Sequence, residues 1–177
     1  MDRIWGGGIV SKIGVVMGST SDLPVVEKAI HILEEYQVPF EVRVLSAHRC
    51  PNEAREFAAS ARESGFSVLI AAAGMAAHLA GALAANTTLP VIGIPCSGAN
   101  FDGMDALLST VQMPGGIPVA TVAVNGAKNA ALLIGVEVKG DKTNKELAAK
   151  LAESRRRETE AVLQADTDMR RRFHADA

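Results

Sequence analysis

Residues 13–22 read Ile13-Gly14-Val15-Val16-Met17-Gly18-Ser19-Thr20-Ser21-Asp22, and this stretch decides the fold class. Its first half is a continuous apolar run, which is typical of a strand covered on both faces in a parallel sheet. A turn rich in hydroxyl groups follows, and the next residues predict a helix from about Leu23 to Tyr36 with Asp22 as its N-cap. Backbone N–H groups and hydroxyls before a helix favour a phosphate site, although plain helix capping is the commoner reason for such a pattern.

The same change from strand to helix recurs along the chain. Further strands are predicted at residues 40–45, 68–73, 91–94 and 119–124, and further helices at 51–64, 75–86, 103–111, 125–138 and 143–163. Asn125 is expected to cap the helix that it precedes. Five alternations predict one α/β domain, residues 12–163, with a doubly wound parallel sheet between two layers of helices. The ends, residues 1–11 and 164–177, are expected to be flexible.

Composition narrows the classes of function. The chain has 177 residues, a formal net charge of −2 and only 4% aromatic residues, which argues against nucleic acid or an anionic membrane as partner. The N-terminal residues lack the apolar segment of a secretory signal, and no apolar run is long enough to span a membrane. Cys50 and Cys96 are the only cysteines and lack metal-ligand spacing, so we expect a reducing compartment and no structural disulfide. Together these features predict a soluble cytoplasmic protein.

Two histidines follow predicted strands. The stretch Ser46-Ala47-His48-Arg49-Cys50-Pro51 ends the second strand, and Gly74-Met75-Ala76-Ala77-His78-Leu79-Ala80-Gly81 ends the third. Histidine transfers protons near neutral pH, and arginine holds anions with its planar fork. Each histidine alone is more often an ordinary structural residue. Because the carboxyl ends of parallel strands share one edge, the three loops together predict a site for a phosphorylated small molecule.

Four motifs resemble one known family. They are Gly18-Ser19-x-Ser21-Asp22, Ser46-Ala47-His48-Arg49, Ala73-Gly74-x-Ala76-Ala77-His78-Leu79 and Val111-Gln112-Met113-Pro114, and they resemble the 5-(carboxyamino)imidazole ribonucleotide mutases of purine biosynthesis, from about Lys12 to Glu160. The resemblance implies a flavodoxin-like three-layer α/β/α sandwich. It also implies a cytoplasmic homo-octamer, with the C-terminal helix at a subunit interface, active sites at subunit contacts, and neither a metal nor an organic cofactor.

The resemblance also implies a role for each matching residue. His48 is the expected catalytic proton shuttle, Arg49 and Ser19 contact the substrate phosphate, and Asp22 contacts the ribose hydroxyls. The rest of the implied substrate-binding set is Ser21, Ser46, Ala47, Gly74, His78 and Leu79. The chain departs from the family's usual residues in having Met75 for glycine, Ala80 for proline and Cys50 for threonine.

The implied reaction is an isomerisation. The carboxylate of 5-(carboxyamino)imidazole ribonucleotide moves from the exocyclic nitrogen to ring carbon four, through decarboxylation, trapped CO2 and recarboxylation, on the route to IMP. The nearest alternative is a direct carboxylase of aminoimidazole ribonucleotide that uses free CO2. His78 and Arg49 favour the mutase, because that sister class lacks this histidine and has lysine in place of the arginine. A flavodoxin-like carrier of flavin mononucleotide is a second alternative, although the loops lack aromatic residues to sandwich a flavin.

Three features of the sequence allow more than one interpretation. Met113 either closes the pocket or packs in the core, since methionine fills irregular gaps. Apolar residues of the terminal helix, among them Leu151 and Val162, recur at helical spacing and need a partner surface. The arginine run at residues 155–157 lies among glutamates, which favours a solvated or subunit-bridging helix face over a nucleic-acid site.

Overall fold

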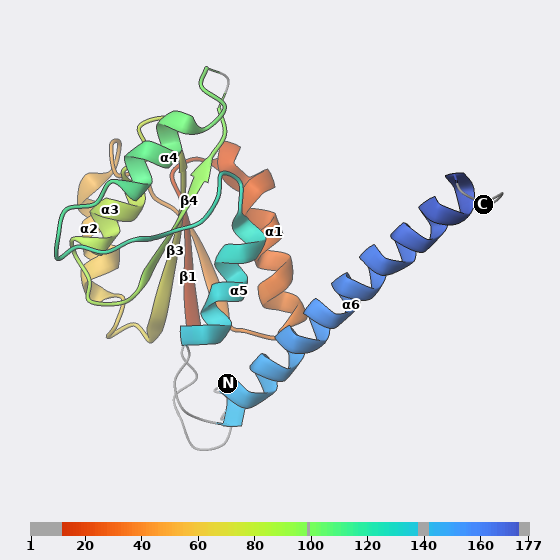
Figure 1. Cartoon of the computed structure of the whole chain (residues 1–177). Coiled ribbons are helices and arrows are strands. Elements are labelled where there is room, and N and C mark those ends of the chain that lie inside the picture. Colours follow the sequence, from red (N-terminus) through yellow and green to blue (C-terminus); the bar gives the residue numbers. More distant parts are fainter. Residues whose placement is uncertain (1–11, 99, 138–141, 174–177) are drawn as a thin grey trace. The chain divides into compact units, whose positions relative to one another are not determined.

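A five-stranded parallel sheet forms the centre of the protein (Figure 1). The computed structural model describes residues 12–98, 100–137 and 142–173. The strands lie in the order β2-β1-β3-β4-β5, so β1 has β2 on one side and β3 on the other. Their bounds are β1 Lys12–Met17, β2 Phe40–Val44, β3 Phe66–Gly74, β4 Val91–Cys96 and β5 Ala120–Thr121. The predicted doubly wound parallel sheet is therefore confirmed.

Helices cover both faces of this sheet (Figure 1). Helices α1 and α5 lie on one face, and α2, α3 and α4 lie on the other. The bounds of the five are α1 Leu23–Glu35, α2 Pro51–Ser60, α3 Leu79–Ala84, α4 Met104–Val111 and α5 Ala127–Glu137. A short 3-10 helix, η1, spans Thr20–Asp22 directly before α1. This arrangement is the three-layer sandwich that the alternating pattern predicted.

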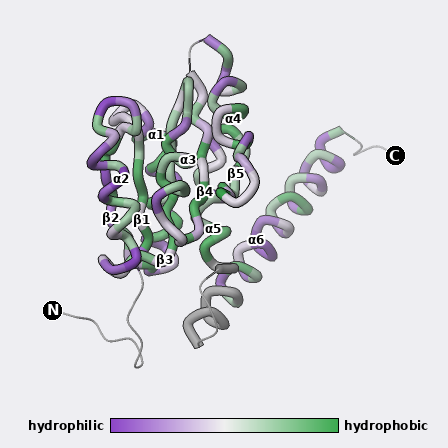
Figure 2. The backbone as a smooth tube through the Cα atoms, turned by 90° about the vertical axis from the view of Figure 1, so that its left-hand side faces the viewer, coloured by the Kyte–Doolittle hydropathy of each residue, from purple (hydrophilic) through white to green (hydrophobic). Residues whose placement is uncertain are grey.

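The core is built from small aliphatic side chains. Strands β1, β3 and β4 are almost entirely buried, and Figure 2 shows them as hydrophobic segments of the backbone tube. On one face, Leu69 and Ala71 of β3 pack with Ala54 and Ala58 of α2 and with Leu83 of α3. Alanines at these contacts let the helices approach the sheet closely, which fixes where each strand ends.

The strand register places the loops of interest at one edge. Met17 is paired with Val44 of β2 and with Ala72 of β3, while Gly74 at the end of β3 is paired with Cys96 of β4. The strand after β1 is added on one side of it, and the next strand, β3, is added on the other side, so the order of addition reverses beside β1. Loops after β1, β2 and β3 therefore meet at the point of a doubly wound sheet where ligands bind.

The chain divides into two compact units, residues up to Ile134 and residues from Gly135 onward. Within the second unit, α6 runs from Lys142 to Phe173. The predicted helix end at Leu163 was thus ten residues too early, because the segment expected to be flexible from residue 164 is helical through Phe173. Residues 1–11 and 174–177, the other parts expected to be flexible, lie outside the described residues.

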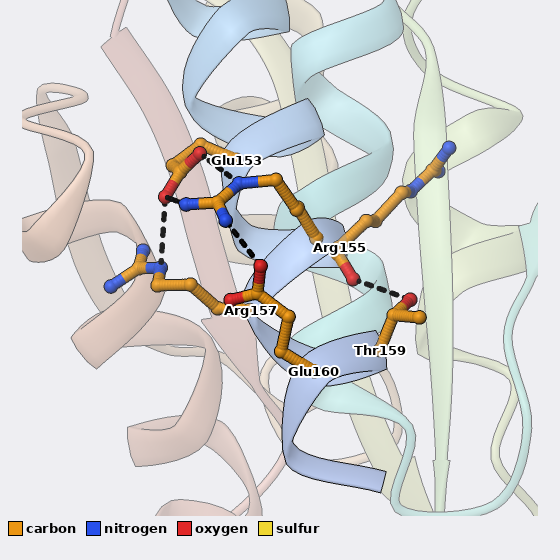
Figure 3. Close-up of polar contacts among 6 residues, drawn as sticks. Glu153, Arg155, Arg157, Thr159 and Glu160 are labelled. Carbon is orange, nitrogen blue, oxygen red and sulfur yellow. Dashed lines mark hydrogen bonds and ion pairs between the residues drawn. The ribbon is translucent and has the colours of Figure 1, made fainter. Parts of the chain in front are cut away.

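Ion pairs run along the surface of α6 (Figure 3). Arg156 pairs with Glu153 at 2.6 Å and also with Glu160, and the Thr159 hydroxyl donates to the carbonyl of Arg155 at 3.0 Å. Arg156 and Arg157 of the arginine run are therefore paired with glutamates of their own helix. In the part of α6 whose side chains are described, exposed large apolar residues include Val162, Leu163, Met169 and Phe173. None of the helices among the described residues has the length and apolar character to cross a membrane.

Candidate active site

The loop after β1 forms a rigid polar turn. Ser19 is the N-cap of η1, and its backbone N–H donates to Oδ2 of Asp22 at 3.1 Å. The Ser21 hydroxyl and the Ser19 hydroxyl lie 2.9 Å apart. Asp22 was predicted to cap α1, but its carboxylate makes no capping bond to that helix and reaches back to Ser19 instead. The turn thus fixes the carboxylate and leaves two adjacent hydroxyls at the edge of the sheet.

Asp22 is partly buried in this turn, and burial raises the pKa of its carboxyl group. The hydrogen bond from the Ser19 N–H and the positive charge of Arg49 act in the opposite direction. Desolvation is the larger effect, so burial disfavours the ionised form of the Asp22 carboxylate. A ligand that donates hydrogen bonds to this carboxylate would offset this effect of burial.

Arg49 connects the loop after β2 to the loop after β1. Its Nη2 donates to the carbonyl oxygen of Gly18 at 3.0 Å, and its Nε lies 3.4 Å from the Ser46 hydroxyl oxygen. The Arg49 backbone N–H also donates to that hydroxyl oxygen at 3.2 Å. A guanidinium has five N–H groups in a fixed plane, so it can hold this carbonyl and still face an anion. The two loops predicted to meet are therefore in direct contact.

His48 and His78 form a pair of imidazole rings. The ring centroids lie 4.0 Å apart with an angle of 55° between the planes, although the two residues are 30 positions apart in sequence. Both side chains are exposed at the edge of the sheet. The ordinary alternative for His78 was a structural histidine, and its exposed position beside His48 favours a role in the site instead. Two neighbouring imidazoles can hold and pass a proton near neutral pH.

The loop after β3 approaches β4 closely. A Cβ atom on Gly74 would lie 3.3 Å from the carbonyl oxygen of Cys96, so a larger residue at this position would crowd the neighbouring strand. The next residue, Met75, has φ of 57°, in the left-handed region that favours glycine, and its side chain is 67% exposed. The departure from the family's usual glycine therefore falls on a position where glycine would be free of strain.

Two further predicted residues, Leu79 and Ala47, lie beside the site, together with Cys50, which was expected to be structural. Leu79 is 2% exposed within the core, so its main chain is the part that can meet a ligand. Ala47 is half-buried against the same apolar cluster. The Cys50 sulfur accepts a hydrogen bond from the Ser46 N–H at 3.0 Å, which closes the turn that carries His48.

One contact near the site was predicted wrongly from the sequence, and a second bears on an alternative that the sequence left open. The Asn125 side chain bonds to Ser97 at the end of β4, so it does not cap α5 as expected. Met113 packs against α3, since its sulfur lies 3.1 Å from the point where a Cβ on Gly81 would be. That contact favours the packing role of the two considered for Met113. For each of these two residues the sequence pattern is compatible with two roles. Only the contacts in the folded structure show which of the two the residue has.

The Cys96 thiol lies under the site and is inert. Burial and the neighbouring Asp22 carboxylate raise its pKa to about 12. A thiol with such a pKa stays protonated at neutral pH and is a poor nucleophile. Among the described residues, no three His, Cys, Asp or Glu side chains are grouped so that they could hold a metal ion.

Comparison with known proteins shows the family of this chain. The family described as AIR carboxylase matches residues 12–161. The N5-carboxyaminoimidazole ribonucleotide mutase of Pyrococcus horikoshii is 58% identical over 121 residues, which is 68% of this chain and 68% of that protein. Its counterpart of the same name in Thermotoga maritima is 48% identical over 153 residues, which is 86% of this chain and 88% of the relative.

Two other relatives extend the comparison. The phosphoribosylaminoimidazole carboxylase of Ogataea methanolica is 54% identical over 132 residues, which is 75% of this chain but 24% of that larger protein. The crystal structure of Treponema denticola PurE matches the fold with a TM-score of 0.76 at 25% identity, covering 91% of this chain and 99% of that one.

Proposed function

This chain belongs to the AIR carboxylase family, and on that premise we propose that it is an ATP-independent mutase of purine biosynthesis. It converts 5-(carboxyamino)imidazole ribonucleotide to 4-carboxy-5-aminoimidazole ribonucleotide, on the route to IMP. The observation that carries the proposal is the bond from Arg49 to the Gly18 carbonyl, because it joins an anion-binding loop to the loop that bears His48. A ribonucleotide phosphate held there lies beside a group that transfers protons.

Substrate binding uses groups that the site already orients. Arg49 and the Ser19 hydroxyl contact the phosphate, and the Asp22 carboxylate accepts hydrogen bonds from the ribose hydroxyls. Those bonds stabilise the ionised form of a carboxylate that burial otherwise disfavours. Ser46, Gly74 and His78 line the pocket for the base and the carboxylate, and Ser21, Ala47 and Leu79 complete the substrate-binding set.

The chemistry needs one proton donor that later acts as a base. His48, as imidazolium, gives its proton to the exocyclic nitrogen, the bond from nitrogen to the carboxyl carbon breaks, and CO2 is released into the pocket. Ring carbon four then attacks CO2 and forms the new carbon–carbon bond. The neutral His48 removes the proton from that carbon, which restores the aromatic ring and returns the imidazolium. A group in this double role needs a pKa near the working pH, as imidazole has.

Retention of CO2 requires a small, dry space. Ala72, Ala77 and Ala80 are each at most 2% exposed around the loop after β3. Short apolar side chains give water few hydrogen-bonding partners, so they disfavour hydration of the trapped CO2. The proposal includes a homo-octamer in the cytoplasm, as the family resemblance implies, in which a neighbouring subunit completes this enclosure. Light scattering tests the octamer, and cell fractionation tests the location.

The decisive experiment supplies the purified protein with each candidate substrate in the absence of ATP. The proposed mutase interconverts the two carboxylated ribonucleotides, and a 13C label in the carboxylate stays with the molecule in the presence of unlabelled bicarbonate. A direct carboxylase would instead act on aminoimidazole ribonucleotide with free CO2 and would ignore the carbamate. A non-catalytic flavin carrier would turn over neither and would be coloured when loaded.

A further inference from the structure

Asn125 makes three hydrogen bonds to the end of β4. Its Oδ1 accepts from the Ser97 N–H at 3.0 Å, its Nδ2 donates to the Ser97 hydroxyl at 2.8 Å, and its own N–H donates to the Pro95 carbonyl at 2.8 Å. The residue has φ of 58°, in the left-handed region that asparagine tolerates better than most residues. This conformation turns both the main chain and the side chain of Asn125 toward the same three residues.

The segment held by Asn125 supports two loops of the site. Its central residue, Cys96, is paired with Gly74 across the sheet, and the Cys96 carbonyl lies 3.3 Å from the point where a Cβ on Gly74 would be. Cys96 is also close enough to Asp22 for that carboxylate to raise the pKa of its thiol, in addition to the larger effect of burial. A shift of Cys96 would therefore displace the loop that leads to His78 and change the surroundings of Asp22.

We propose that Asn125 is a positioning residue for the active site. It holds in place the segment Pro95–Ser97, called the floor below, against which the loops bearing Gly74 and Asp22 are positioned. The expected effect of replacing Asn125 on turnover rests on the proposed function, whereas the expected effect on the position of the floor does not. Asn125 touches neither substrate nor reacting atoms in this account. Its contribution is to hold His78 against His48 and to keep Asp22 at the ribose. Displacements of about 1 Å at a reacting centre cost up to about 100-fold in rate.

Three variants separate the bonds of Asn125 from its backbone. Asn125→Gly keeps the left-handed conformation without strain and removes both side-chain bonds. Asn125→Asp keeps an acceptor for the Ser97 N–H, and the Ser97 hydroxyl can donate to its other oxygen. Ser97→Ala removes only the hydroxyl contact. We expect kcat/KM to fall about 10-fold or more in Asn125→Gly, to recover to within about threefold of wild type in Asn125→Asp, and to lie between these values in Ser97→Ala.

A second measurement does not depend on the reaction. Cys96 is 2% exposed and Cys50 is half-buried elsewhere in the site, so the two cysteines form an internal pair of reporters. Alkylation followed by peptide mass spectrometry gives the rate at each. The proposal expects Asn125→Gly to accelerate labelling of Cys96 about 10-fold or more relative to Cys50, with reversal in Asn125→Asp.

The outcomes are distinct. Wild-type kcat and KM in Asn125→Gly, measured well below its unfolding temperature, would overturn the positioning role. Equal acceleration at both cysteines would also overturn it, since that result indicates general loosening of the fold. A wild-type protein without turnover would refute the proposed function, and the labelling ratio would then decide the role of Asn125 alone.

Discussion

Replacement of Arg49 by lysine keeps the positive charge but removes the planar fork. In the structure the guanidinium holds the Gly18 carbonyl through Nη2 at 3.0 Å and approaches the Ser46 hydroxyl through Nε. A lysine ammonium is a single point of charge, so it cannot hold the carbonyl and the substrate phosphate in one fixed geometry. We therefore expect Arg49→Lys to weaken binding of the ribonucleotide more than it slows the chemical step.

The size of the effect follows from the bond that is lost. One hydrogen bond to a charged group contributes about 1.5–3 kcal/mol, and about 1.4 kcal/mol corresponds to a tenfold change in affinity. Loss of one arm of the fork thus predicts a rise in KM of about 10- to 100-fold, with kcat within about threefold of wild type. The matched control, Arg62→Lys, makes the same change at a guanidinium that bonds to Thr88 and has no role in the proposed site, so its KM is expected to stay at the wild-type value.

Steady-state kinetics and calorimetric titration with the product ribonucleotide measure the two quantities separately. Calorimetry is needed because KM equals the dissociation constant only where substrate dissociates faster than it reacts. An unchanged dissociation constant in Arg49→Lys would show that Arg49 does not hold the phosphate. A large fall in kcat with unchanged KM would instead assign Arg49 to the chemical step, and the reasoning above would be wrong.

Four further predictions concern other parts of the chain. His48→Asn is expected to lower kcat at least about 100-fold while calorimetry still detects ribonucleotide binding, and near-normal turnover would exclude His48 as the shuttle. Met75→Gly relieves a left-handed φ at an exposed side chain and is expected to stabilise the fold by about 0.5–1 kcal/mol, whereas the control Ala76→Gly lowers the melting temperature. Asp22→Asn is expected to raise the melting temperature near pH 7, because the raised pKa of Asp22 makes its ionisation in the folded state unfavourable. This gain in melting temperature should vanish at about pH 3, where Asp22 is protonated in both the folded and the unfolded state. The same variant is expected to weaken ribonucleotide binding. Truncation before Lys142 is expected to lower both the assembled mass in light scattering and the activity, and a fully active monomeric intact protein would contradict the assembly proposal.

The fold could be predicted from the sequence because its strands are short apolar runs separated by helical patterns. The ends of elements were harder to predict. The strand expected at residues 119–124 is only Ala120–Thr121, since β5 lies at the sheet edge and is paired with β4 alone. Helix α6 continues past Leu163 because no glycine or proline interrupts it, and the pair formed by Arg170 and Asp166 at 3.1 Å supports its last turns.

The candidate site could be predicted as a set of loops but not as a set of contacts. Parallel strands bring the loops after β1, β2 and β3 to one edge, which is why His48 and His78 could be expected to lie together. The partner of Asn125 could not be predicted, because an asparagine before a helix carries the same local signal whether it caps that helix or bonds to a distant strand. Burial of Asp22 is likewise a property of the packed loops and has no signal in the residues around it.

The departures from the family's usual residues differ in what they change. At position 50 a cysteine replaces threonine, yet its sulfur accepts a hydrogen bond from the Ser46 N–H, so the turn that carries His48 keeps a side-chain acceptor.

At position 75 a methionine replaces glycine and adopts the left-handed conformation all the same. A backbone that keeps this conformation with a side chain that disfavours it must be held by its surroundings. The hydrogen bonds from Ala77 to the Met75 carbonyl and from His78 to the Ala76 carbonyl, both 2.8 Å, supply local restraint, and the close contact of Gly74 with Cys96 supplies the rest. Strain at Met75 is therefore the cost of keeping His78 where it meets His48, which is why Met75→Gly should gain stability without loss of the imidazole pair.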